Sequence, residues 1–230
     1  MTSSRRKKAS RRTSPSLRAV YQRLLRTYGA QHWWPGDSRF EIMVGAVLTQ
    51  NTAWTNVERA IANLKHARAL TPEAIVRAPP GRLAQWLKPS GYFNVKAKRL
   101  RNMCQWMVEQ GGVGALARRN THDLRAALIA VHGIGPETAD DIALYAFDRP
   151  VFVIDAYTRR FFARLGMIKG DEGYETLRHM FEDDLGADAQ VFNEYHALIV
   201  RHGKDVCRMR PRCDACRFAG ICPAASTSQR

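Results

Sequence analysis

The sequence lacks any long apolar segment. Its longest apolar run, Ile42 to Leu48, is far shorter than the roughly 20 residues that a membrane-spanning helix needs. The arginine-rich N-terminus also lacks the apolar stretch of a signal peptide. We therefore expect a soluble, intracellular protein with no membrane partner.

Acidic residues are scarce. The 230 residues include 36 Lys and Arg against 21 Asp and Glu, which gives a formal net charge of +15. The first acid is Asp37, and nine basic residues precede it, most of them in residues 1–15, for which we predict a disordered basic arm. Subtracting those nine leaves about +6 on the remainder, so a polyanion such as nucleic acid is the expected partner. A charge run kept only for solubility is the alternative.

Cysteine is nearly absent from the first 200 residues. Cys104 stands alone there, and the other four form a C-x5-C-x2-C-x5-C motif close to the C-terminus: Cys207, Cys213, Cys216 and Cys222. A disulfide framework would spread its cysteines along the chain, so four thiols in one short segment indicate a metal site. Zinc and a 4Fe-4S cluster both accept four cysteines, and because only the central pair has the C-x2-C spacing, the pattern favours the cluster.

Strand patterns are almost missing. Only Val151 to Ile154 resembles a strand, and it is too short and isolated to pair. Helical spacing of apolar residues begins near Ser16 and continues on both sides of a polar turn at Thr49 to Thr52. The chain is therefore predicted to be all-α, with about ten helices. Further helices are predicted over residues 72–77, 81–87, 94–110, 121–131, 136–147, 156–166, 172–184 and 187–202.

Two glycines mark a tight turn between the helices of residues 124–147. Gly133 and Gly135 allow positive φ, Ile134 can plug between the helices, and the free N–H groups that start the second helix can face a phosphate. An ordinary helix C-cap and loop is the alternative. Together with the basic chain, the pattern predicts a helix-hairpin-helix that binds DNA.

Asp155 follows the apolar run and opens a predicted helix. Taken alone, it is typical of an N-cap. However, the chain carries four motifs in succession: a glycine hairpin, an Asp after an apolar run, His202-Gly-Lys and four clustered cysteines. Their order resembles that of the endonuclease III family of DNA glycosylases. The chain resembles that family over residues 30–223.

The resemblance implies two helical lobes with damaged double-stranded DNA in the cleft between them. One lobe, residues 16–37 with 156–230, would hold the 4Fe-4S cluster, and the other, residues 38–155, would form a helical barrel. Asp155 would be catalytic, since a carboxylate below C1′ stabilises the positive charge that develops on the sugar and orients water, once the base has been flipped out. We expect a monomer located in the cytoplasm and, in a bacterium, associated with the nucleoid.

The family's DNA-contacting positions fall on residues of several segments. Gln50 and Asn51 match the loop that fills the gap left by the flipped base, and Tyr92 matches a second wedge; a helix cap and a half-buried tyrosine are the alternatives. The resemblance also implies DNA contacts by Gly133, Ile134, Gly135, Thr138 and Lys204.

Two departures from the family pattern define the expected subtype. Glu137 stands where bifunctional members carry the lysine that cuts the strand, so no AP lyase activity is expected by that route, and Glu137 should point away from any phosphate. Trp33, Trp34 and Pro35 with Trp54 resemble the 3-methyladenine DNA glycosylase III branch, in which such residues line the base pocket.

Indole faces attract the positive charge of an N-alkylated purine. Such a base can leave without a general acid. This agrees with the sequence, in which Asp155 is the single obvious carboxylate. The only acids near the tryptophans in sequence are Asp37 and Glu41. The sequence thus predicts a monofunctional DNA N-glycosylase of base excision repair that removes alkylated purines such as 3-methyladenine. The alternatives are packing roles for Trp33 and Trp34, a glycosylase for oxidised pyrimidines or mismatched bases, and a non-catalytic DNA-binding protein.

Overall fold

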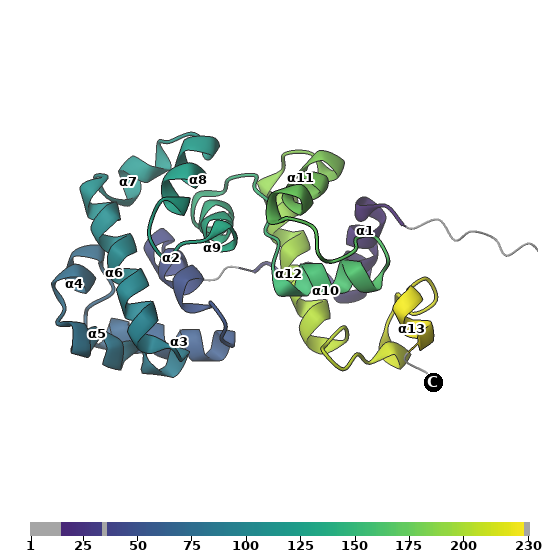
Figure 1. The fold of residues 1–230 in the computed structure, drawn as a ribbon, viewed down its shortest axis with the longest axis horizontal. Helices are drawn as coiled ribbons and strands as arrows, with labels where there is room; N and C mark the ends of the chain where they lie inside the picture. The colour runs from purple at the N-terminus through teal and green to yellow at the C-terminus, as the bar shows by residue number, and fades with distance from the viewer. Residues whose placement is uncertain (1–14, 34–35, 228–230) are drawn as a thin grey trace, which may run out of the picture.

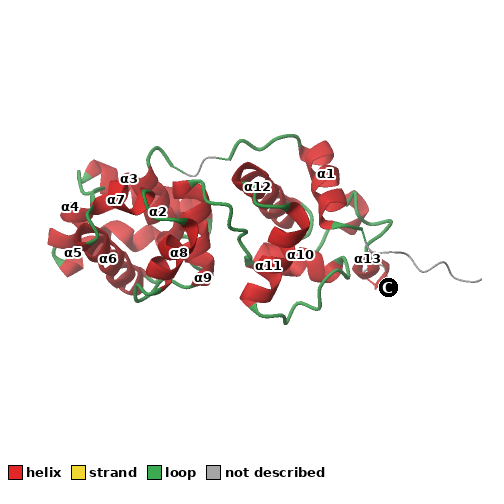
Figure 2. Ribbon diagram, turned by 90° about the horizontal axis from the view of Figure 1, so that it is seen from above, coloured by secondary structure: helices red, strands yellow, loops and turns green. Residues whose placement is uncertain are grey.

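The computed structural model describes residues 15–33 and 36–227. The predicted basic arm lies almost entirely outside these ranges, as do Trp34 and Pro35. Within them the chain forms helices and loops and no β-strand (Figure 2). The predicted all-α class is therefore confirmed, and Val151 to Ile154 is an extended, unpaired segment.

The helices follow the apolar periodicity of the sequence closely. The α-helices are α1 (Leu17–Tyr28), α2 (Arg39–Leu48), α3 (Trp54–His66), α4 (Pro72–Arg77), α5 (Pro80–Leu87), α6 (Phe93–Glu109), α7 (Gly112–Ala117), α8 (Thr121–Ile129), α9 (Pro136–Asp141), α10 (Ala156–Arg164), α11 (Tyr174–Leu185), α12 (Ala189–Asp205) and α13 (Pro223–Thr227). Single turns are the 3-10 helices η1 (Lys88–Ser90) and η3 (Cys213–Ala215) and the π-helix η2 (Ile142–Ala146). The predicted helix 136–147 is thus α9 continued by η2.

Two helical lobes lie side by side, as the family resemblance implies (Figure 1). Helices α2 to α9 form one lobe, and α1 with α10 to α13 forms the other. Helix α1 packs against α11 and α12, so the N-terminal helix joins the C-terminal lobe. The chain passes between the lobes twice, in the loop before α2 and in the loop before α10.

Helix α2 is the centre of the first lobe. Every residue from Phe40 to Leu48 is buried, because α3, α6, α9 and η2 surround the helix. Gly45 lets the next helix approach: a Cβ at this position would lie 3.1 Å from Cη2 of Trp54. The close approach brings the indole of Trp54 against α2.

Aromatic rings fill the core of the second lobe. Phe152 stacks on Phe181 at 4.4 Å between ring centroids and meets Phe192 and Tyr195 edge-on. Such contacts add specific geometry to the burial of large apolar area. They anchor the extended segment that leads to Asp155.

Candidate active site

Asp155 sits at the start of α10, where its two carboxylate oxygens have different partners. Oδ1 accepts a hydrogen bond from the Thr158 amide at 2.7 Å, and Oδ2 lies 3.5 Å from Nε2 of His196. Burial opposes ionisation, but His196 and the Thr158 amide outweigh it and hold the pKa of Asp155 below its ordinary value. Asp155 is therefore both an N-cap and an ionised carboxylate paired with His196.

His196 comes from α12, and sequence reasoning did not select it. Its side chain is 5% exposed, and its Nδ1 shares a hydrogen bond with the buried hydroxyl of Tyr145. Burial lowers the pKa of His196, but Asp155 above all raises it, and the net shift is upward. Nε2 faces Asp155 without a hydrogen bond of good geometry.

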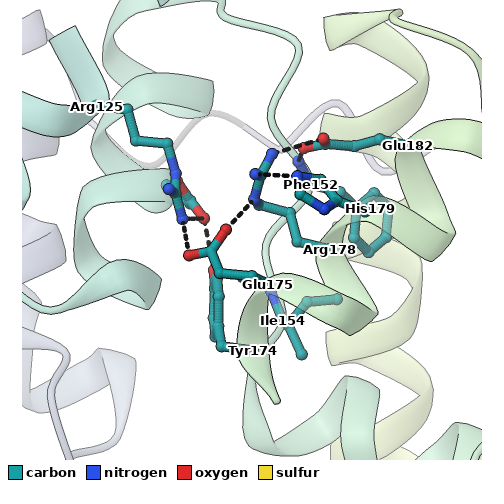
Figure 3. Close-up of polar contacts among 9 residues, drawn as sticks. Arg125, Phe152, Ile154, Tyr174, Glu175, Arg178, His179 and Glu182 are labelled. Atoms are coloured by element: carbon teal, nitrogen blue, oxygen red, sulfur yellow. Dashed lines mark hydrogen bonds and ion pairs between the residues drawn. The ribbon is translucent and has the colours of Figure 1, made fainter. Parts of the chain in front are cut away.

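Two amides hold the segment before Asp155 in place (Figure 3). The Phe152 amide donates to Oε1 of Glu182 at 2.9 Å, and the Ile154 amide donates to the Tyr174 hydroxyl at 3.4 Å. Both partners belong to α11. The Tyr174 hydroxyl in turn donates to Oδ2 of Asp140 in α9 at 2.8 Å, so the segment is tied to both lobes.

Arg125 of α8 completes this connection between the lobes. It donates to Oδ1 and Oδ2 of Asp140 at 2.6 and 3.1 Å, and to Oε1 of Glu175 in α11 at 2.6 Å. Arg178 binds the other oxygen of Glu175 at 3.0 Å and Oε2 of Glu182 at 2.6 Å, so α11 carries a continuous row of ion pairs (Figure 3). Asp140 is completely buried.

Asp155 opens into a cavity of about 800 Å³ between the lobes. Trp33 and Trp54 both line it, and the Trp33 ring meets Tyr145 edge-on at 5.4 Å between centroids. A pocket of this size, largely apolar with a few polar groups, suits a small planar ligand. The charged or titratable side chains in its wall are Glu137, Asp141, Tyr145, Asp155, Tyr157, Arg160, His196, Lys204 and Arg208.

The expectation of a single carboxylate in the pocket is wrong. Glu137 and Asp141 of α9 line the cavity together with Asp155, because one turn of that helix separates them and places both on the cavity side. Asp37 and Glu41 are not part of the wall and instead bind Lys65, each at 2.8 Å.

Glu137 is exposed and Asp141 is half-buried, and partial desolvation of their carboxyls raises the pKa of both. Burial, then the negative charge of Asp155, raises the pKa of Glu137. Burial raises the pKa of Asp141 to about 8, with Glu137 and Asp155 adding to the effect and His196 opposing it. Glu137, expected to point away from any phosphate, thus lies in the wall of the cavity.

Only one of the two hairpin glycines has a backbone conformation that requires glycine. Gly133 has φ +99°, and a Cβ there would lie 2.4 Å from Cγ of Arg99, so only glycine fits. Gly135 has φ −91°, an ordinary extended value, and a Cβ there would meet nothing within 4 Å. The prediction of positive φ at Gly135 is therefore wrong. The space next to its Cα is nevertheless open, so a ligand can approach the backbone there. Ile134 is buried as the expected plug.

The Thr138 hydroxyl is bound within the protein. The residue is buried, and its Oγ1 accepts a hydrogen bond from Nε2 of Gln50 at 2.9 Å. Gln50 also donates to the carbonyl of Gly133 at 3.3 Å and accepts from Arg99. The DNA contact expected at Thr138 stays a prediction, and the structure adds that this residue anchors Gln50 and so couples the loop after α2 to the hairpin.

The remaining expected DNA contacts are exposed. Tyr92 is 73% exposed at the start of α6 with φ 44°, so the alternative of a half-buried tyrosine does not apply. Asn51 is exposed with φ 55° and lines the cavity. Lys204 is exposed in the last turn of α12 and lines the same cavity near Asp155.

All four C-terminal cysteines line a second, smaller cavity of about 250 Å³. They are free thiols, and across residues 15–33 and 36–227 no three His, Cys, Asp or Glu side chains are placed so that they could hold a metal ion. N–H groups nonetheless face the sulfurs: Arg164 donates to Sγ of Cys207 and the Phe218 amide to Sγ of Cys216, both at 3.4 Å. Four thiols around one cavity, two of which face N–H donors, suit a four-cysteine cluster.

Two arginines that sequence reasoning missed hold the loop of the first cysteine. Arg160 donates to the carbonyls of Cys207 and Gly203 at 2.8 and 3.0 Å. Arg164 donates to the carbonyls of Arg208 and Met209 at 2.6 and 2.9 Å. Both arginines lie on α10, one turn apart, in the helix that Asp155 caps. Cys104 is buried far from this loop in α6, where burial raises the pKa of its thiol.

Comparison with known proteins agrees with the fold and the site. Residues 44–185 match the family model described as HhH-GPD superfamily base excision DNA repair protein. The "Putative DNA repair glycosylase" of Methanocaldococcus jannaschii is 46% identical over 206 residues, which cover 88% of this chain and 94% of that protein. Endonuclease III of Thermotoga maritima is 26% identical over 80% of this chain and 82% of its own length.

Two solved structures share the fold. The Helicobacter pylori 3-methyladenine DNA glycosylase bound to 1,N6-ethenoadenine matches with a TM-score of 0.68 and 30% identity, over 80% of this chain and 93% of that chain. An endonuclease III–DNA complex matches with a TM-score of 0.81 and 19% identity, over 93% and 97%. The helical lobes and the cavity at Asp155 define a DNA glycosylase of the base excision repair class. The chain belongs to the HhH-GPD superfamily.

Proposed function

We propose that this DNA glycosylase is monofunctional and removes alkylated purines such as 3-methyladenine. The observation that carries the proposal is the cavity at Asp155, which combines the indoles of Trp33 and Trp54 with two carboxyls beyond the one that the reaction needs. Aromatic faces, together with carboxyls that can exchange a proton for a cation, favour a flat cationic base. The likeness to a 3-methyladenine DNA glycosylase structure supports the same substrate class.

Asp155 is the proposed catalytic residue. Breaking the N-glycosidic bond moves electrons onto the base and leaves positive charge on the sugar, which an ionised carboxylate stabilises. Asp155 keeps its charge although it is buried, since His196 and the Thr158 amide lower its pKa. A water molecule oriented by the same carboxylate would then attack C1′, and the product is an abasic site.

The position of Glu137 and the contacts of Lys96 support the proposed lack of a strand-cutting step. Glu137 occupies the hairpin position at which bifunctional members of the family carry lysine. Lys96 is buried, and its Nζ donates to the carbonyls of Leu48 and Ser90 at 2.8 and 2.6 Å, so its amine is engaged away from the cavity. Lys204 is the lysine of the cavity wall, and borohydride trapping with a Lys204→Ala control tests whether its amine forms a Schiff base.

We propose that Cys207, Cys213, Cys216 and Cys222 hold a 4Fe-4S cluster. Their common cavity and the N–H groups that face two of the sulfurs support it. The group would cross-link the C-terminal loop and shape its basic surface, a structural role. Iron analysis of anaerobically purified protein should give about four irons per chain, whereas zinc without iron would contradict the proposal.

The deciding experiment is a panel of duplexes, each with one lesion, scored for release of free base. Release of alkylated purine with an intact strand supports the proposal. Release of an oxidised pyrimidine or a mismatched base alone would reassign the substrate, and binding without any release would indicate a non-catalytic DNA-binding protein.

One chain supplies Asp155 and the whole described cavity, so we further propose a monomer that acts on DNA in the cytoplasm. Gel filtration tests the oligomeric state, and cell fractionation tests the location.

A further inference from the structure

Asp141 is an acidic residue in the cavity that the proposed reaction leaves without a task. It is the last residue of α9, and its carboxyl lines the wall shared with Trp33, Trp54 and Asp155. Among residues 15–33 and 36–227 it has no side-chain hydrogen bond or ion-pair partner, in contrast to its neighbour Asp140, which binds Arg125 and Tyr174. Asp141 is half-buried, so its carboxyl is partly desolvated and no protein partner offsets that cost.

Asp155 and Arg160, two of the other charged residues of the cavity, already have partners. Asp155 faces His196 at 3.5 Å, and the buried Nε2 of His196 has no other partner. Arg160 is bound to carbonyls of the cysteine loop. The pairing of Asp155 with His196 leaves Asp141 and Glu137 as the unmatched acids.

The cations and the unmatched acids occupy different walls. Arg160, Lys204 and Arg208 belong to α10, α12 and the following loop of the second lobe, whereas Glu137 and Asp141 belong to α9 of the first. The apolar wall residues Ile42, Ala46 and Trp54 also come from the first lobe. DNA phosphates would therefore meet the basic wall, and a flipped base would meet the wall that carries Trp54 and Asp141.

We infer that Asp141 is a specificity-determining residue whose carboxylate pairs with the positive charge of an N-alkylated purine held against Trp33 and Trp54. The inference rests on the proposed function and names a residue that selects its substrate class. The raised pKa of Asp141, about 8, fits this role, because a cationic base can take the place of the proton that burial favours on this carboxyl. Burial is the largest cause of this raised pKa; among the charged neighbours, His196 lowers it and Glu137, Asp155 and Asp140 raise it.

The test compares a cationic and a neutral base in single-turnover excision. One duplex carries 7-methylguanine, a cation, and the other carries neutral 1,N6-ethenoadenine. Asp141→Asn should slow release of 7-methylguanine about ten-fold or more, as expected for losing a charged hydrogen-bond partner, and should change release of ethenoadenine less than about three-fold. Asp183→Asn, at an exposed position of α11, removes the same charge elsewhere and should change neither rate.

A binding measurement gives a second readout that does not depend on turnover. In an Asp155→Asn background, the preference for the 7-methylguanine duplex over unmodified DNA should fall about ten-fold when Asp141→Asn is added. If the wild-type protein releases no alkylated purine, the proposed function fails and the inference fails with it. If it does release them and Asp141→Asn preserves both the rate and the binding preference, only the role of Asp141 is overturned.

Discussion

Replacement of Arg125 by alanine should destabilise the protein in a manner that depends on pH. Asp140 is completely buried, and Arg125→Ala removes its two hydrogen bonds of 2.6 and 3.1 Å, leaving the Tyr174 hydroxyl at 2.8 Å. Removing one partner of a buried ion pair typically costs about 3–5 kcal/mol of the free energy of unfolding. That is a large share of the roughly 5–15 kcal/mol available to a domain.

The carboxyl can escape this cost by taking up a proton, which limits the loss. Burial already raises the pKa of Asp140 above its ordinary 3.8, and Arg125 offsets only part of that effect. Without Arg125 the folded pKa rises further, and protonation costs about 1.4 kcal/mol for each pH unit above 3.8. Protonation of Asp140 therefore limits the loss of unfolding free energy in Arg125→Ala to about 5 kcal/mol at pH 7.5 and about 1.6 kcal/mol at pH 5.

The sign of the pH dependence follows from proton binding. In the variant, the folded state keeps a proton that the unfolded state releases above pH 3.8, so its stability falls as the pH rises. Urea unfolding at pH 5 and pH 7.5 should show a loss of about 3–5 kcal/mol at pH 7.5 and less than about 2 kcal/mol at pH 5. Arg118→Ala, at an exposed arginine bound to one carbonyl, should lose less than about 1 kcal/mol at either pH. An equal loss at both pH values for Arg125→Ala would refute the buried-charge explanation.

The remaining predictions concern the reaction and the cluster. Asp155→Asn should keep the N-cap and the affinity for DNA but reduce base excision by roughly two orders of magnitude, because it removes a preorganised charge; a folded variant with normal turnover would exclude Asp155 as the catalytic residue. Trp54→Ala should lower excision of alkylated purine about ten-fold or more through lost stacking, while binding to undamaged duplex, which depends on phosphates, stays within about three-fold. Cys213→Ser should lose the broad absorption near about 400 nm and the bound iron, and Cys104→Ser should lose neither; equal losses would mean that the ligand set is wrong.

Local sequence patterns were sufficient for the helices and for part of the site. Apolar spacing of 3.6 residues predicted nearly every helix to within a few residues, because burial of one face is a local property of an amphipathic segment. The position of Asp155 before α10 was likewise readable, since a helix start and its N-cap are encoded by neighbouring residues. The resemblance to a known family added the two lobes and the order of the motifs.

Only the tertiary structure brought His196 to Asp155, placed Asp141 and Glu137 in the same cavity, and buried Thr138 under Gln50. Each of these residues is polar and lies on a helix where the sequence alone also permits a solvated face. Which polar side chains become buried depends on how helices far apart in the chain pack together, as η2 and α12 do beside Asp155. Local periodicity in the sequence does not encode that packing. The helices of this protein were thus determined locally, whereas the charge balance of its cavity was decided by the assembly of the two lobes.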